Sequence, residues 1–288
     1  MENNFKQEIR QYFYLYGMLE KRIWNIIPYF IQIYCIRQIF KLRKNDMCGM
    51  IHLSYGGNKR DLDISAFKDS KIKLKISKLP SGYAGNFQDE TQKLTINFNE
   101  FSKNYKDNGT NLYYTLEHEL FHALQNYLIH MENKPDGFID YIKYLKAYRD
   151  TNDVLISIFD INGYGNLHIK EIGICDFGNN YINKLSKIFY TLNISERDAF
   201  YEAKVKGERF VYEANHAGLG NFEKYDLYGI LDEQLSEFKK HYECYKLSDS
   251  QIFTLIDKCF YHLRYNESPE DNLQAVVMYD IAWLSVLH

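Results

Sequence analysis

Several features that mark whole classes of protein are scarce or missing in this chain of 288 residues. Only 4 prolines and 16 glycines are present, too few for a disordered or linker-rich protein. The 5 cysteines are odd in number and include no CxxC pair, so the sequence predicts neither a disulfide framework nor a cysteine-based zinc site. The net charge of −3 lacks the basic excess of nucleic-acid-binding proteins, and we expect no nucleic-acid partner.

No long uninterrupted apolar run is present either. Residues 23–40 are the most apolar stretch, but polar side chains and a proline interrupt it, whereas a membrane-spanning helix needs about 20 apolar residues in succession. We therefore expect a buried pair of helices that meet at Pro28, rather than a helix on a membrane surface, and no membrane partner. The polar start, MENNFKQEIR, does not resemble a signal peptide, and the expected location is cytoplasmic.

Hydrophobic periodicity predicts an α+β fold with helices at both ends and a small group of strands between them. Alternation of apolar and polar residues indicates strands at 49–56, 71–77, 82–87 and 94–98, the last two forming a β-hairpin. The predicted helical stretches are 1–46, 110–131, 138–150, 176–192, a helix that begins at Glu196 with Ser195 as its cap, 221–246, 249–265 and 268–287.

The stretch TLEHELFHALQNYL (115–128) contains the motif HExxH. Because residues four apart lie on the same face of a helix, His118 and His122 can bind one zinc ion, and Glu119 can reach a water at that ion. With 9 histidines and 19 glutamates in the chain, chance alone gives about 0.02 such matches. The alternative is an ordinary amphipathic helix that carries two surface histidines.

A catalytic zinc site usually has three protein ligands, so a third ligand must come from elsewhere in the chain. The continuation HExxHxxGxxH would need a glycine at 125 and a histidine at 128, where the chain has Gln125 and Leu128. The candidate third ligands are carboxylates that follow the motif, namely Glu196, Glu202, Glu213, Asp198 and Glu171. The alternative for Glu196 is a glutamate that only stabilises the start of its helix through the helix dipole.

Together with Glu196-Arg197-Asp198-Ala199, the motif resembles the zincin metallopeptidases of the gluzincin-like group, whose third ligand is a glutamate on a later helix, often in the pattern E-x-x-A. The resemblance implies a zincin-like catalytic core with a small mixed sheet and an HExxH active-site helix. It also implies Zn²⁺ bound by His118, His122 and Glu196. The strand at 82–87 would line the cleft and pair with an extended substrate.

The resemblance covers roughly residues 48–215 and sets the expected organisation of the chain. An N-terminal helical segment (1–46) precedes a zincin-like catalytic domain (47–220), and a C-terminal helical segment (221–288) follows it.

The reaction expected from these residues is hydrolysis of a bond in a peptide or protein substrate. Zinc lowers the pKa of a water molecule, and Glu119 accepts the proton and passes it to the leaving amine. A donor to the developing oxyanion is also needed, and the candidates that follow the third-ligand helix are Tyr201, Tyr212 and, as our choice, His216.

Two other functions fit the same pattern. The first is a zincin-like binding or regulatory module without hydrolytic activity, although a purely structural metal site has no need of a base such as Glu119. The second is a metal-dependent hydrolase that acts on amides other than peptides.

Overall fold

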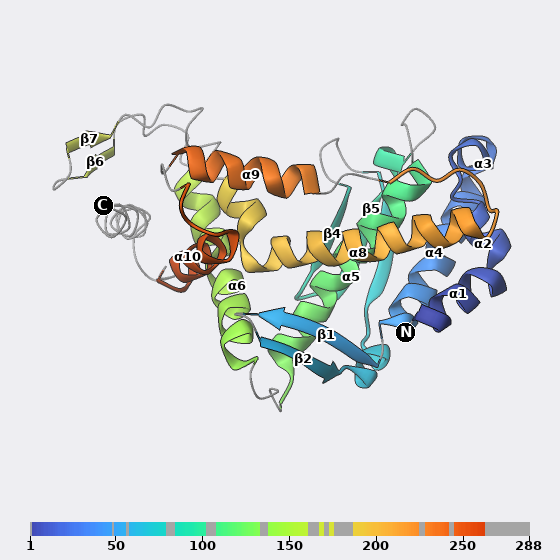
Figure 1. Ribbon diagram of the computed structural model, residues 1–288, viewed down its shortest axis with the longest axis horizontal. Helices are drawn as coiled ribbons and strands as arrows, with labels where there is room; N and C mark the ends of the chain where they lie inside the picture. Colours follow the sequence, from blue (N-terminus) through green and yellow to red (C-terminus); the bar gives the residue numbers. More distant parts are fainter. Residues whose placement is uncertain are drawn as a thin grey trace. The chain divides into compact units, whose positions relative to one another are not determined.

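The computed structural model describes residues 2–47, 49–55, 58–78, 84–101, 108–132, 138–160, 167–169, 173–175, 187–224, 228–241 and 245–262 (Figure 1). Over these residues the fold is α+β and mostly helical, with a small three-stranded mixed sheet. The chain forms two compact units, the first made of Met1–Ser54, Lys59–Glu132 and Asp198–Tyr228, the second of Tyr55–Asn58, Asn133–Arg197 and Gly229–His288. The division of the chain into three segments stays a prediction.

Four helices open the chain: α1 (Glu2–Gln11), α2 (Phe13–Gly17), α3 (Lys21–Ile26) and α4 (Tyr29–Asp46). The Glu20 carboxylate caps α3 by accepting hydrogen bonds from the backbone N–H groups of Arg22 and Ile23. Pro28 stands directly before α4, which confirms the predicted break in the helical run.

α4 buries only one of its faces. The buried residues on α4 are Gln32, Cys35, Ile36, Ile39, Phe40 and Arg43. Phe30 and Tyr34 on the same helix are exposed, as is Ile26 at the end of α3, so the predicted burial of this helix pair holds for one side alone. Among the described residues, no helix combines the length and the apolar character needed to cross a membrane.

The sheet consists of β3 (Lys73–Ser77), β4 (Gly85–Gln88) and β5 (Lys93–Asn97) in the order β3-β5-β4. β5 runs parallel to β3 and antiparallel to β4, which confirms the predicted hairpin, while residues 82 and 83 of its first strand lie outside the described residues. The sheet packs against the long helix α5 (Asn108–His130). β4 therefore forms an edge of the sheet next to the helix that carries the HExxH motif.

A second pair of strands, β1 (Met50–Tyr55) and β2 (Asn58–Asp63), stands apart from this sheet. β1 matches the predicted strand at 49–56. β2 was missed because its sequence, NKRDLD, is almost entirely polar and offers no alternation of apolar residues.

The helix α8 (Ile194–His216), which belongs to the first unit from Asp198 onwards, packs antiparallel to α5. Along α5 the contacts run from Tyr113 to Glu117 to His118, and their partners on α8 are Phe210, Lys206 and Phe200 in that order. Because the residue numbers of the contacts rise along α5 while they fall along α8, the two helices are antiparallel. The next turn of α8 towards its start carries Glu196, so this register brings it to the motif.

A glycine on α8 makes room for an aromatic ring from α5. A Cβ atom added to Gly207 of α8 would lie 2.3 Å from ring atoms of Tyr114 on α5. Any other residue at 207 would have to push the helices apart or displace the tyrosine ring.

The second unit contains α6 (Ile139–Asp160), α9 (Tyr228–His241) and α10 (Asp249–His262), together with the short strands β6 (Leu167–Ile169) and β7 (Gly173–Cys175). α6 begins one residue after the predicted start at 138 and continues ten residues beyond the predicted end at 150. Residues 187–192 are helical as predicted, whereas 176–186 and the last predicted helix, 268–287, lie outside the described residues.

Candidate metal centre

His118 and His122 on α5 and Glu196 on α8 form a group that could hold a metal ion. Their ligand atoms all lie within 4.8 Å of one another. The Nε2 atoms of the two histidines are 3.0 Å apart, and the ring planes are nearly perpendicular. A tetrahedral zinc ion with nitrogen ligands at about 2.0–2.1 Å would hold two such atoms roughly 3.3 Å apart, so the observed separation suits a shared ion.

Gln125 fixes the orientation of one histidine. Its Oε1 atom lies 2.9 Å from Nδ1 of His122, and its side chain is fully buried. An amide oxygen can only accept, so Nδ1 of His122 carries the proton and Nε2 keeps its lone pair on the side of His118. In the sequence, Gln125 was notable only because the continuation HExxHxxGxxH would need a glycine at that position. Its role as a partner of a ligand is visible only in the structure.

Replacing Gln125 should therefore weaken metal binding without removing a ligand. We expect Gln125→Leu to lower zinc affinity by about 10–100-fold, the usual effect of losing a hydrogen bond to a ligating histidine. Gln125→Glu keeps an acceptor at the same place and should retain most of the affinity. Competition with a zinc-chelating dye measures both variants, and equal affinities for Gln125→Leu and the parent would contradict the role of Gln125.

Asn193 sets the start of the helix that carries Glu196. Its side-chain Oδ1 accepts hydrogen bonds from the backbone N–H groups of Ser195, at 2.8 Å, and Glu196, at 3.0 Å. The cap is thus Asn193 and not Ser195, and α8 begins at Ile194, two residues earlier than predicted. Glu196 lies in the first turn, where the helix dipole favours a negative charge.

An ion pair holds the residue after Glu196 within the second unit. The guanidinium group of Arg197 makes two hydrogen bonds of 3.3 Å to the carboxylate of Asp257 on α10, and both side chains are buried. The guanidinium also lies 4.5 Å from the centre of the Phe253 ring. These contacts fix the first turn of α8 and with it the backbone of Glu196.

Glu119, the glutamate of the motif, lies against the edge strand β4. Its side chain is buried, although Glu119 is next in sequence to a candidate ligand. The backbone of β4 approaches it so closely that a Cβ atom added to Gly85 would lie 2.8 Å from its Cγ and 2.9 Å from its Oε1. The same added atom would lie 2.9 Å from a methyl carbon of Thr115, so only glycine fits at 85.

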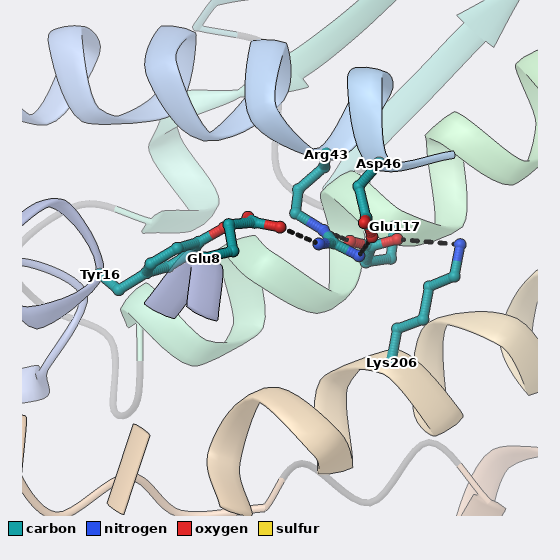
Figure 2. Close-up of polar contacts among 6 residues, drawn as sticks. All are labelled: Glu8, Tyr16, Arg43, Asp46, Glu117 and Lys206. Carbon is teal, nitrogen blue, oxygen red and sulfur yellow. Dashed lines mark hydrogen bonds and ion pairs between the residues drawn. The ribbon is translucent and has the colours of Figure 1, made fainter. Parts of the chain in front are cut away.

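A cluster of charges surrounds Glu117, the buried residue directly before the motif (Figure 2). Nε of Arg43, from α4, donates to Oε1 of Glu117, and Nζ of Lys206, from α8, lies 3.4 Å from Oε2 of the same carboxylate. Nη2 of Arg43 also lies 2.9 Å from Oδ2 of Asp46, and its Nη1 lies 3.4 Å from Oε2 of Glu8. Glu117 directly precedes His118, so this cluster ties α4 and α8 to α5, the helix of the motif.

The charge state of Glu117 follows from these partners. Complete burial would raise the pKa of its carboxyl group, but Arg43 and Lys206 outweigh that effect and hold the pKa below its usual range. Glu117 is therefore ionised at neutral pH, and it is committed to these ion pairs.

The rival third ligands are not brought to the two histidines. Among the described residues, only Glu196 joins His118 and His122 in a group of this kind, and Glu171 lies outside those residues. Glu202 belongs to the neighbourhood of Glu117 and Lys206, where burial raises the pKa of its carboxyl group.

His216 does not lie near the candidate site. It is exposed at the last turn of α8, where its ring packs on Tyr212, with ring centres 4.0 Å apart, and its Nδ1 lies 2.9 Å from the carbonyl oxygen of Tyr212. Twenty residues of one helix separate it from Glu196, a distance of about 30 Å at 1.5 Å per residue. We therefore withdraw His216 as the oxyanion donor. The other two candidates for that role, Tyr201 and Tyr212, are exposed side chains.

The donor set fits a catalytic zinc ion. Two imidazole nitrogens and one carboxylate are the ligands found in one type of catalytic zinc site, and they leave a fourth position open.

Comparisons with family profiles, curated proteins and solved structures find no match for this chain. The inference of function therefore rests on the residues and their geometry.

Proposed function

We propose that this protein is a zinc-dependent metallopeptidase. His118, His122 and Glu196 would hold the ion. When bound, the ion would act as a Lewis acid and would lower the pKa of a water molecule. The observation that carries the proposal is the position of Glu119, which follows His118 in the chain, is buried and lies against the backbone of the edge strand β4. A site built only to hold a metal has no use for such a carboxylate.

Glu119 supplies the acid–base chemistry of the proposed reaction. Its carboxylate accepts a proton from the attacking water at Oε1 or Oε2 and then donates that proton to the nitrogen of the leaving amine. The tight contact with Gly85 restricts its side chain, so that little conformational freedom is lost when it acts.

Among the described strands, β4 pairs with β5 alone, and its other edge offers a place for an extended substrate. The backbone N–H of Asn97 donates to the carbonyl of Ala84 at 2.9 Å, so the backbone groups of Ala84 face β5. Because antiparallel pairing alternates, the N–H and C=O groups of Gly85 and Phe87 face the open edge. A peptide added as a further strand would bond to these groups and lie beside Glu119.

A proline at 87 tests this arrangement. Phe87→Pro removes one outward N–H while it leaves the hydrogen bonds to β5 in place, because edge strands tolerate proline on their open side. We expect the KM for a peptide to rise about tenfold, with zinc still bound, since one hydrogen bond to the substrate is lost. Phe87→Ala keeps the N–H and controls for the loss of the ring. Equal kinetics for the Pro and Ala variants would remove β4 from substrate binding.

The proposed activity itself is tested by digestion of an unbiased peptide library with the purified protein. We expect cleavage that stops when a chelator removes the metal and returns when zinc is added. If the zinc-loaded protein cleaves no peptide, the peptidase proposal fails, and a binding module or a hydrolase of other amides takes its place.

A further inference from the structure

One face of α4 is exposed although it carries large apolar side chains. Phe30, Tyr34, Arg37 and Lys41 follow one another at offsets of 4, 7 and 11 residues, which places them within an arc of about 60° on the helix. We call these four residues the aromatic–basic face. Phe30 is 71 % exposed and Tyr34 is 59 % exposed, and Arg37 and Lys41 are exposed as well.

Packing within the described part of the fold does not account for the large apolar side chains on this face. The opposite side of α4 packs into the core and contributes Arg43 to the charge cluster around Glu117, so the helix is already anchored. Ile26, which is 77 % exposed, and Tyr29 stand just before the aromatic–basic face. Of the thirteen large apolar side chains that are exposed in the described part of the chain, seven lie between residues 13 and 34. A concentration of this kind marks a surface that binds something.

The charge of the same segment indicates what it binds. Residues 21–45 contain 6 of the 35 basic residues of the chain and none of its 38 acidic residues, although the whole chain has a net charge of −3. Arg37 and Lys41 take part in no ion pair with the described residues. Their charges are therefore available to an anionic partner.

The shape and the order of residues favour a lipid surface. The apolar residues Phe30 and Tyr34 occupy the first half of a convex helix face, and the basic residues Arg37 and Lys41 occupy the second half. Helices that lie in a bilayer interface combine aromatic and aliphatic side chains, which enter the acyl boundary, with Lys and Arg, whose long stems keep their charges at the headgroups.

We infer that the aromatic–basic face of α4 (blue in Figure 1) binds the surface of an anionic lipid bilayer. Phe30 and Tyr34 enter the interface, and Arg37 and Lys41 pair with lipid phosphates and carboxylates. This inference reverses the expectation of no membrane partner that the sequence suggested. It does not depend on the metal centre, because no residue of the face belongs to that site.

Co-sedimentation of the full chain with lipid vesicles tests the inference. We expect binding to phosphatidylcholine vesicles that contain phosphatidylserine, much weaker binding to phosphatidylcholine alone, and weaker binding as salt rises. Arg37→Gln combined with Lys41→Gln should lower the partition coefficient about 25-fold, or about fivefold for each charge removed. Phe30→Ser combined with Tyr34→Ser should lower it by at least about tenfold.

Matched controls use residues of the same kind elsewhere on the surface. Lys224→Gln combined with Lys240→Gln removes two exposed charges, and Tyr245→Ser removes an exposed aromatic ring. These variants should bind vesicles as the parent does. The inference is overturned if the parent ignores phosphatidylserine vesicles, or if the control variants lose as much binding as the face variants. Self-association without vesicles that disappears in Phe30→Ser would also overturn it and would assign the face to a second copy of the chain.

Discussion

Glu119→Gln is expected to lower the kcat for a peptide substrate by a factor of about 10²–10⁴, with no loss of zinc. Gln has nearly the same shape as Glu and can occupy the space beside Gly85, but its amide cannot accept and return a proton. Because the interaction lost is one made during the reaction, kcat should fall while KM changes little.

The comparison needs a glutamate outside the site. Glu132, which is exposed just beyond the end of α5, serves as the matched position, and Glu132→Gln should behave as the parent does. Steady-state kinetics and zinc content are measured on the same preparations. A Glu119→Gln variant that keeps most of the parent's turnover would remove Glu119 from the role of base and favour the binding-module function.

Arg43→Met is expected to lower the free energy of unfolding by about 3–5 kcal/mol, among the largest effects open to a single change in this chain. Arg43 and Glu117 are both almost fully buried, so the loss of the guanidinium group would leave the Glu117 carboxylate in the interior with Lys206 as its remaining partner. An uncompensated charge in the interior costs far more than the ion pair itself contributes.

A double variant separates the charge from the packing. Arg43→Met combined with Glu117→Gln removes both charges, and we expect it to unfold at a higher denaturant concentration than Arg43→Met alone. Chemical denaturation of the parent, the two single variants and the double variant gives the coupling energy. Strictly additive effects would show that the two residues do not act as a pair.

The motif helix and the hairpin were predictable because each follows a local rule. Apolar residues at helical spacing delimit α5, and alternation along β3 and β5 gives the strands. Glu196 was found through the resemblance to a family, and the antiparallel register of α5 and α8 then agrees with it. The signal for its cap, Asn193 three residues before Glu196, is also local and could have been recognised.

The remaining features depend on contacts between residues far apart in the chain. Arg43 and Glu117 are separated by 74 residues, and no periodicity in the sequence links them. The partnership of Gln125 with His122 requires knowledge of the ring orientation, which sequence does not carry. The choice of His216 failed for a simpler reason, since a continuous helix from Ile194 to His216 necessarily carries it away from Glu196.

The metal content of purified variants tests the central claim most directly. We predict one zinc ion per chain in the parent, measured by elemental analysis, and its loss in His118→Ala, His122→Ala and Glu196→Gln. Glu202→Gln serves as the control, because Glu202 lies on the same helix but about 240° around it from Glu196. It should keep the zinc. Zinc that stays in the two histidine variants would contradict the account, and zinc lost from Glu202→Gln but kept in Glu196→Gln would contradict the ligand set.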